Sequence, residues 1–531
     1  MSQQLYENGT ILTMDEQHGL YAEALLVKDG TIAAVGGRAQ VEALADGARK
    51  VDLAGRTLMP AFIDPHSHLS NYATALQQVP LEEARSYDEL VDKIKAFIHE
   101  KEIPAGQWVT AKGYDHNQLA EGCPPDRQVL DRAAPENPLV LQHKSGHTGV
   151  FNTQALRELG VTADTPDPAG GKIGRAQGQL TGYMEENAFV NYLQRVPLPS
   201  PQDLLALYTK AQQCYASHGI TTVQDGMVVD VMVPLYRFLL EKDALFLDTV
   251  ACADLRDCET FLDTFHDHID QYKQHFKIGG YKTFLDGSPQ ARTAWMRTPY
   301  KNAEGGYRGY PTLTDEQLLT HIRRALREGR QLLAHCNGAA AAQQYLDMFT
   351  KALGELDDAP DIRPVMIHAQ LLDRDQLPRL REIGMIPSFF VGHVYHWGDV
   401  HIRNFGPARA ARISCAASAL KEHILFTFHQ DAPVIEPDML ETVWCAVNRL
   451  TKAGVPLGPE ERISPLEALK AVTVNAAYQY FEERQKGTLE PGKLADLVIL
   501  SDDPLRVDPM AIRDIQVLET IKRGETIYQA E

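Results

Sequence analysis

Eight short apolar runs, separated by segments with helical spacing, constrain the fold of this chain more than any other feature. The runs occupy residues 58–66, 219–226, 245–254, 278–287, 330–338, 363–370, 384–392 and 423–431. Apolar runs that alternate with helices are typical of parallel strands buried on both faces. The count favours a (β/α)8 TIM barrel, an α/β fold, over an open doubly wound sheet.

Two of the segments outside these runs carry clear helix signals. Residues 315–329 place apolar side chains at helical spacing and end at Gly329, and residues 464–481 open with Ser464 and Pro465. Serine is a favoured helix cap, proline suits the first helical position, and glycine commonly follows a helix end. We therefore predict a helix in each segment.

Both ends of the chain read as short β segments with turn signals between them. The turn dipeptides are Asn8-Gly9, Asp29-Gly30, Pro491-Gly492 and Arg523-Gly524. Dipeptides of this kind are typical of hairpins and tight turns. We predict that residues 1–57 and 485–531 pair into one small β-sandwich domain beside a barrel domain over residues 58–484.

A long interval separates the first and second predicted strands. It spans about 150 residues, whereas an ordinary connection from strand to helix takes only a few. We predict that residues 70–215 form a large insertion after the first barrel strand, placed as a lid.

The composition is that of a globular chain with excess acid. The 531 residues carry a formal net charge of −19, and 44% of them are hydrophobic. Because acidic surfaces repel nucleic acid and anionic membranes, we expect a small-molecule substrate and neither of those partners. The seven cysteines include no C-x-x-C pair and the N-terminus has no signal-peptide pattern, so we predict a cytoplasmic protein. The sequence does not decide whether the protein forms a homodimer.

The first apolar run leads directly into His66, Ser67 and His68. Side chains alternate between the faces of an extended strand, so two histidines one residue apart point the same way and can share one metal ion. Such a pair can also arise by chance among 19 histidines. Its place at the end of a buried strand, where barrel enzymes keep their chemistry, favours a metal site.

Candidate ligands also close three later runs: His335, His368 and Asp431. Taken singly, such a histidine is more often a hydrogen-bonded core residue and such an aspartate a helix cap. Together with His66 and His68, they place four histidines and a carboxylate at one end of the predicted barrel. That combination indicates a metal centre.

Lys282 lies near the end of the run at 278–287. Most lysines are solvated surface charges, but alternation puts Lys282, Phe284 and Asp286 on one face of this strand. Burial beside a divalent metal favours the neutral amine. Such an amine could take up carbon dioxide as a carbamate and bridge two ions.

Motifs along nearly the whole chain resemble those of a known superfamily. They are ENGTILTM, VKDGTIAAVG, FIDPHSH, SGHTGVFNTQAL, GITTVQDG, YKTFLDGSPQARTAWM, LLAHCNG, MIHAQLLD, DAPV and KGTLEPGKLADLVIL. The chain resembles the amidohydrolase superfamily, in particular its YtcJ-like group of metal-dependent hydrolases, which includes N-substituted formamide deformylase. The resemblance implies a catalytic barrel with a terminal β-sandwich and one set of metal ligands: His66, His68, Lys282 as a carboxylated lysine, His335, His368 and Asp431.

Three positions depart from the usual pattern of the superfamily. Ala61 stands where glycine is usual, Ala339 where aspartate is common, and Gln430 where serine is common. None of these changes removes a ligand. They do prevent the transfer of a known substrate to this chain.

The resemblance implies metal-assisted hydrolysis of a non-peptide C–N bond, with an N-formyl or N-acyl amine as the expected substrate. One or two divalent ions, with zinc expected, would activate water, and Asp431 would act as general base and then general acid. The same centre could instead serve a deaminase or an ester or lactone hydrolase. A non-catalytic scaffold is the remaining alternative, although all six ligand positions are occupied.

Polar and aromatic residues in predicted loops are candidate substrate contacts, and a structural role explains each of them equally well. The candidates are His147, Arg292, Trp295, His393 and His396, with His143, Tyr395 and Trp397 as further members of the same motifs. The aromatic loops suggest an apolar or aromatic group on the substrate.

Overall fold

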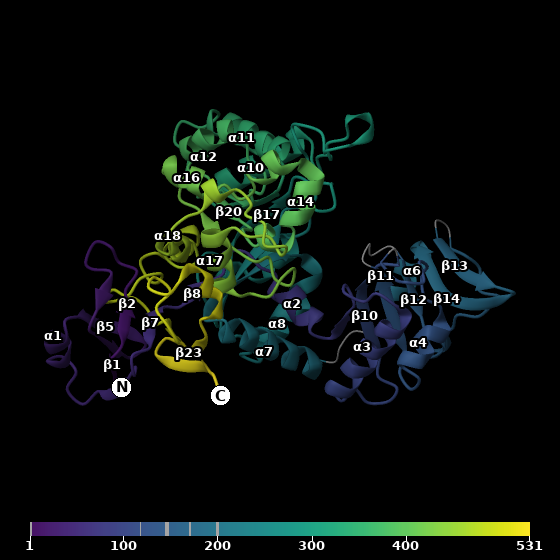
Figure 1. Cartoon of the computed structure of the whole chain (residues 1–531), viewed down its shortest axis with the longest axis horizontal. Helices are drawn as coiled ribbons and strands as arrows, with labels where there is room; N and C mark the ends of the chain where they lie inside the picture. The colour runs from purple at the N-terminus through teal and green to yellow at the C-terminus, as the bar shows by residue number, and fades with distance from the viewer. Residues whose placement is uncertain (1–2, 117, 144–147, 169–170, 198–200) are drawn as a thin grey trace. The chain divides into compact units, whose positions relative to one another are not determined.

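The computed structural model describes residues 3–116, 118–143, 148–168, 171–197 and 201–531. The chain divides into two compact units, whose elements are labelled in Figure 1. Unit 1 combines Met1–Asn71 with Tyr208–Glu531, and unit 2 is Tyr72–Leu207.

All eight predicted runs contribute strands to one sheet of unit 1. The strands are β8 (Phe62–Ile63), β15 (Ile220–Val228), β16 (Asp248–Asp254), β17 (Phe276–Phe284), β18 (Leu332–Cys336), β19 (Val365–His368), β20 (Ile386–Phe389) and β21 (Thr427–Phe428). Each strand pairs in parallel with its neighbour in the chain order. The predicted parallel α/β sheet is therefore confirmed, and the carboxyl ends of its strands lie along one edge.

The predicted strand over 58–66 is wrong in part, because the chain changes sheets there. β7 (Thr57–Pro60) pairs antiparallel with β22 (Leu497–Leu500), and only β8 belongs to the eight-stranded sheet. Between β7 and β8, the Ala61 N–H donates to the Asp496 carbonyl oxygen at 3.0 Å. His66 and His68 consequently lie beyond the strand rather than on it.

Strands from both ends of the chain form two further sheets of unit 1. One has the order β5-β4-β1-β6, and the other β24-β23-β22-β7-β2-β3. Their strands not yet given are β1 (Gln3–Glu7), β2 (Thr10–Leu12), β3 (Tyr21–Ala22), β4 (Ala24–Lys28), β5 (Thr31–Gly36), β6 (Arg49–Asp52), β23 (Val517–Lys522) and β24 (Glu525–Gln529). Leu25, Leu58 and Leu497 belong to one buried apolar cluster that includes side chains of both sheets.

Two of the predicted hairpin turns are present and one is wrong. Asp29-Gly30 joins β4 to β5 and Arg523-Gly524 joins β23 to β24, with left-handed φ angles of 48° and 79°, and of 49° and 77°. Asn8-Gly9 does not make a hairpin, because β1 and β2 lie in different sheets. Gly9 is needed there for close packing, since a Cβ would lie 2.5 Å from the Arg56 carbonyl oxygen.

The helix predicted over 315–329 is α10 (Asp315–Glu328), which begins with a capping box at Thr314 and ends at Gly329 with φ 62°. The helix predicted over 464–481 is wrong in extent, because the chain forms α18 (Pro465–Ala471) and α19 (Val474–Gln479). At the break, the Thr473 hydroxyl donates to the Leu469 carbonyl oxygen at 2.7 Å. Such side-chain bonds compete with the helical backbone pattern.

The remaining helices of unit 1 lie between these elements. They are α1 (Arg38–Glu42), α8 (Val233–Glu241), α9 (Glu259–Thr264), α11 (Ala339–Leu353), α12 (Leu377–Ile383), α13 (His393–His396), α14 (Gly398–Phe405), α15 (Pro407–Ala410), α16 (Ala416–Lys421) and α17 (Met439–Asn448). Two others, α2 (Leu69–Ala75) and α7 (Pro201–Ser217), cross the boundaries of the units.

Unit 2 contains its own sheet, of order β13-β14-β12-β11-β10-β9. Its strands are β9 (Gln78–Pro80), β10 (Val109–Tyr114), β11 (Leu139–His143), β12 (Thr148–Phe151), β13 (Gly171–Ala176) and β14 (Gln179–Glu186). Its helices are α3 (Tyr87–Glu100), α4 (Arg127–Ala133), α5 (Thr153–Glu158) and α6 (Asn187–Leu193). Two buried apolar clusters drawn from residues of this unit give it a core of its own.

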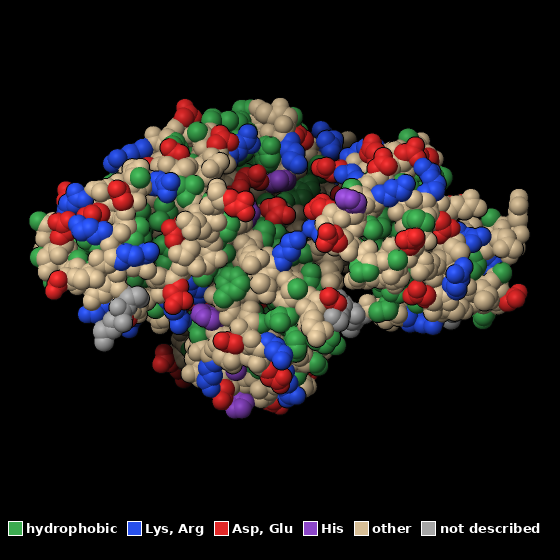
Figure 2. Space-filling view, turned by 90° about the horizontal axis from the view of Figure 1, so that it is seen from below, with side chains coloured by type: hydrophobic (Ala, Val, Ile, Leu, Met, Phe, Trp, Pro, Cys, Tyr) green, Lys and Arg blue, Asp and Glu red, His purple; other side chains and the backbone are tan. Residues whose placement is uncertain are grey.

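The described surface carries charges of both signs. Figure 2 shows acidic and basic side chains interspersed over one face of the molecule. Among the described residues, none of the helices has the length and apolar character needed to cross a membrane.

Candidate metal centre

Six residues predicted as metal ligands come together at the carboxyl ends of the strands in the eight-stranded sheet. We call them the sheet-end cluster: His66, His68, Lys282, His335, His368 and Asp431. All belong to unit 1 and lie in the last residues of β17, β18 and β19 or just beyond β8 and β21.

The donor atoms of the cluster are centred on the Asp431 carboxylate. Asp431 Oδ1 lies 3.2 Å from His66 Nε2 and 3.3 Å from His68 Nε2, and Oδ2 lies 3.9 Å from His368 Nε2. Ligand atoms about 2.1 Å from a tetrahedral zinc ion lie about 3.4 Å from one another. The spacing of the donors is therefore that of a site for one ion.

The hydrogen bonds of His66 show which of its nitrogens faces the carboxylate. Its Nδ1 lies 2.7 Å from Gln224 Oε1, while Gln224 Nε2 donates to the Pro65 carbonyl oxygen at 3.0 Å. Gln224 therefore accepts from Nδ1–H, which leaves a lone pair on Nε2 of the neutral ring. Burial lowers the pKa of His66 well below its ordinary value, so the ring is neutral.

His66 Nε2 and Asp431 Oδ1 are consequently two acceptors that face each other. Two acceptors 3.2 Å apart repel each other unless a cation lies between them. The residues thus fit a bound metal ion.

Lys282 extends the cluster from β17. Its side chain is fully buried, and its Nζ lies 3.4 Å from His66 Nε2. Burial lowers the pKa of Lys282 to about 8. A large fraction of neutral amine is therefore present near pH 8, and this is the form whose lone pair can attack carbon dioxide.

His335 joins the cluster through His368, whose ring centroid lies 4.6 Å from its own. Its Nδ1 also lies 3.5 Å from Asp286 Oδ1. Asp286 is fixed by N–H groups of Trp295, Asn337 and Gly338 at 2.8 to 2.9 Å. Alternation along the predicted strand places Asp286 on the same face as Lys282, but the sequence indicates no role for it.

Two more residues near the cluster were missed. Gln224 lies in β15 and is part of the GITTVQDG motif, but a glutamine inside a predicted strand does not by itself indicate a metal site. His429 lies two residues before Asp431, and its ring centroid is 5.0 Å from that of His66 and 5.1 Å from that of His368. Burial lowers the pKa of His429 to about 3. Alternation with Asp431 was the signal that could have indicated it.

The residues predicted to contact the substrate do not form one cluster, and each has its own partners. His393 Nδ1 lies 3.0 Å from His401 Nε2, His396 Nε2 lies 2.7 Å from Glu441 Oε1, and the Arg292 guanidinium lies over the Tyr300 ring. Trp295 contributes a backbone bond to Asp286. These contacts give His396 and Arg292 structural partners. His147 lies outside the described residues.

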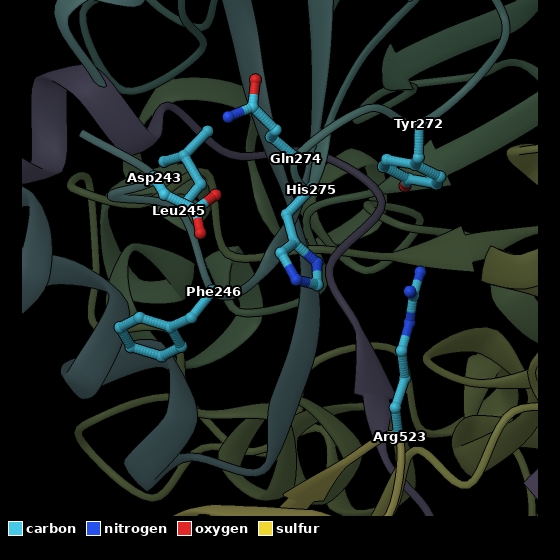
Figure 3. Close-up of a pocket in the computed structure, with 7 residues that line it drawn as sticks. All are labelled: Asp243, Leu245, Phe246, Tyr272, Gln274, His275 and Arg523. Carbon is cyan, nitrogen blue, oxygen red and sulfur yellow. The ribbon is translucent and has the colours of Figure 1, made fainter. Parts of the chain in front are cut away.

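A cavity of about 410 Å³ lies at the opposite ends of the strands (Figure 3). Its lining residues precede β16 and β17 or follow β23: Asp243, Leu245, Phe246, Tyr272, Gln274, His275 and Arg523. Because the sheet-end cluster lies at the carboxyl ends, this cavity belongs to a different part of unit 1.

The model of the Amidohydrolase family matches residues 49–528, which include the whole sheet-end cluster. The chain belongs to the amidohydrolase family. The match covers most of the chain and agrees with the motifs that predicted this membership.

Relatives of this amidohydrolase extend over almost its full length. N-substituted formamide deformylase of Arthrobacter pascens is 29% identical over 98% of this chain and 97% of its own. YtcJ of Bacillus subtilis (strain 168) is 26% identical over 99% of both chains. A solved metal-dependent hydrolase from Pyrococcus horikoshii is 25% identical, with a TM-score of 0.78 over 96% of this chain and 99% of its own. These similarities support a hydrolase that uses a divalent metal.

Proposed function

We propose that this amidohydrolase cleaves the C–N bond of a non-peptide amide, namely an N-formyl or N-acyl amine. The observation that supports the proposal is the pair of acceptors formed by His66 Nε2 and Asp431 Oδ1, which lie 3.2 Å apart and between which a divalent cation would fit. The similarity to a relative named for deformylation of N-substituted formamides supports the choice of substrate class.

The histidines of the sheet-end cluster and Asp431 would hold the ion, with zinc as the proposed metal and Lys282 as a carbamate if a second ion binds. When bound, a divalent metal supplies Lewis-acid chemistry, lowering the pKa of water and polarising a carbonyl group. Several imidazoles and a carboxylate suit zinc and its neighbours in the periodic table.

Asp431 is the proposed proton carrier. As a carboxylate, it can accept a proton from the attacking water. It would then deliver this proton to the leaving nitrogen, since an amine anion is a very poor leaving group. Gln224 would keep His66 in the tautomer whose Nε2 faces the carboxylate.

We also propose that the eight-stranded sheet closes as a (β/α)8 barrel, with the terminal sheets packed as a sandwich. The His68 N–H donates to the Ala432 carbonyl oxygen at 2.9 Å, which joins the segments that follow the first and eighth strands. Closure places Asp431 beside His66 and His68, although these residues are more than 350 positions apart in the printed sequence.

A substrate panel tests the function. Zinc-loaded enzyme is assayed with N-formyl and N-acyl aromatic amines, aromatic esters, lactones and amino-substituted heterocycles, and each product is identified. We expect amine and carboxylate from the amides, at a rate that Asp431→Asn lowers by about 10²-fold or more. Release of ammonia from the heterocycles, or cleavage of esters alone, would overturn the proposal.

A further inference from the structure

We propose that unit 2 carries a metal site of its own, formed by Asp115, His116 and His143. We call these residues the insert cluster. The expected ligand is a divalent transition metal of the zinc type. The three side chains each offer a ligand atom, and these atoms all lie within 4.8 Å of one another.

The insert cluster is built at the carboxyl ends of two neighbouring parallel strands. Tyr114, the last residue of β10, pairs with His143, the last residue of β11. The register shifts between Lys112 and Tyr114, where Gly113 has a φ of 92°. A bulge of this kind re-aims the side chains that follow it. It brings Asp115, just beyond β10, next to His143.

The distances fit coordination better than direct pairing. Asp115 Oδ1 lies 3.6 Å from His143 Nε2, which is too long for a hydrogen bond but close to the separation of about 3.4 Å between ligands of one zinc ion. The ring centroids of His116 and His143 are 5.1 Å apart. Two imidazoles that bind one ion through nitrogens about 2.1 Å away have centroids about 5 Å apart.

The surroundings restrain two of the ligands. Asp115 is 5% exposed and His143 is 9% exposed. Gln118 Nε2 donates to Asp115 Oδ2 at 3.2 Å, and the Tyr114 ring contacts the His143 ring edge-on. Metal ligands are commonly oriented by such neighbours. A two-histidine, one-carboxylate set of this kind favours zinc and similar ions over calcium or magnesium.

Apart from the sheet-end cluster, the other groupings of metal-binding side chains in the described residues are weaker. Each has only one histidine and an exposed member: Cys214, His218 and Glu436, or Asp15, His18 and Glu490. The insert cluster has two histidines and two buried ligands.

The test uses the full-length chain with the sheet-end cluster disabled by His66→Asn and Asp431→Asn. After loading with zinc and dialysis, the metal per chain is measured by mass spectrometry. We expect about one zinc ion per chain to remain, because the insert cluster does not depend on the replaced residues. Adding His116→Gln should remove it, whereas adding His99→Gln, a change at an exposed histidine of the same unit, should not.

Cobalt provides a second measurement that is independent of activity. The disabled protein loaded with Co²⁺ should show visible absorption that His116→Gln abolishes while circular dichroism stays unchanged. The proposal is overturned if the disabled protein retains no metal, or if its metal survives both His116→Gln and Asp115→Asn. Either outcome leaves the proposed hydrolase function untouched, since the assay never uses the sheet-end cluster.

Discussion

At the scale of single residues, the proposed metal centre depends on the tautomer of His66. The Gln224 carboxamide accepts from Nδ1–H and is itself held by its bond to Pro65 and by a 3.0 Å bond from Nε2 to the Tyr480 hydroxyl. This chain of bonds turns the Nε2 lone pair toward Asp431. Gln224, which has no titratable group, thereby makes the Nε2 lone pair of His66 available to a cation.

Gln224→Leu tests this role. Without the acceptor, the His66 ring loses its fixed tautomer, and we expect zinc affinity to fall about 10- to 100-fold. Affinity is measured by competition with a chromogenic chelator. Gln479→Leu is the matched control, because Gln479 is equally buried and also donates to the Pro65 carbonyl oxygen, at 2.9 Å. Equal losses of affinity in both variants would contradict a specific role for Gln224.

The buried pair of His393 and His401 predicts a dependence of stability on pH. Burial lowers the pKa of His401 to about 3, while the unfolded chain titrates near 6.5. Between these values the unfolded chain binds a proton that the folded chain does not, so stability falls as the pH drops below about 6.5. Each such histidine changes the unfolding equilibrium by about tenfold per pH unit.

His401→Phe should therefore make the free energy of unfolding depend less steeply on pH between pH 6 and pH 4.5. The expected decrease in slope corresponds to the uptake of about one proton fewer on unfolding. The midpoint of urea unfolding at several pH values measures it. His266→Asn, a change at a histidine with a 71% exposed side chain, should leave the slope as it is. An unchanged slope in His401→Phe would refute the assignment.

The residues of the sheet-end cluster could be predicted from the sequence, but the residues that contact and orient them could not. His66, His68 and Asp431 could be predicted because strand ends and motifs indicate chemistry directly. Gln224 and Asp286 could not, since their roles depend on hydrogen-bond partners that are brought together only by folding. A glutamine or aspartate inside a predicted strand has many structural explanations.

At the scale of secondary-structure elements, strand order was predictable and strand limits were not. Apolar runs indicated all eight strands, because burial on both faces demands them. The change from one sheet to another at Ala61 could not be predicted, because the residues of β7 and β8 on either side of it are both apolar. The break between α18 and α19 depends on the bond from Thr473 to Leu469, which competes with helical spacing that otherwise continues.

The first residues of α11 contact Asp286, which lies beside the sheet-end cluster. Gly338 caps this helix, its N–H donates to Asp286 Oδ2 at 2.8 Å, and a Cβ added there would overlap the Trp295 backbone. We expect Gly338→Ala to displace the loop that fixes Asp286 beside His335. Both zinc affinity and kcat should fall, with a loss of about 1–3 kcal/mol in the free energy of unfolding.

Gly354→Ala, at the other end of α11, is the matched control. Gly354 has a right-handed φ of −66°, and the nearest atoms to an added Cβ are 3.5 Å away. This change should leave zinc affinity and kcat unaltered, as followed by the same chelator competition and steady-state assays. If Gly338→Ala behaves like Gly354→Ala, the proposed link between α11 and the centre is wrong.

At the scale of the whole molecule, the chain combines segments that are distant in the sequence. β7 pairs with β22 across more than 400 positions, and the segment that forms unit 2 interrupts the chain between β8 and β15. The long interval between predicted strands indicated an extra substructure. The partners within the terminal sheets were not predictable, because many short apolar strands have nearly equal choices of neighbour.

We propose that the sheet-end cluster hydrolyses amides with a divalent metal. The most direct test removes the metal with a chelator, verifies its absence by mass spectrometry, and measures hydrolysis of an N-formyl aromatic amine before and after zinc is added back. We predict that the metal-free protein is inactive and that zinc restores activity, while Asp431→Asn stays inactive with zinc present. Full activity in the metal-free protein would contradict the account.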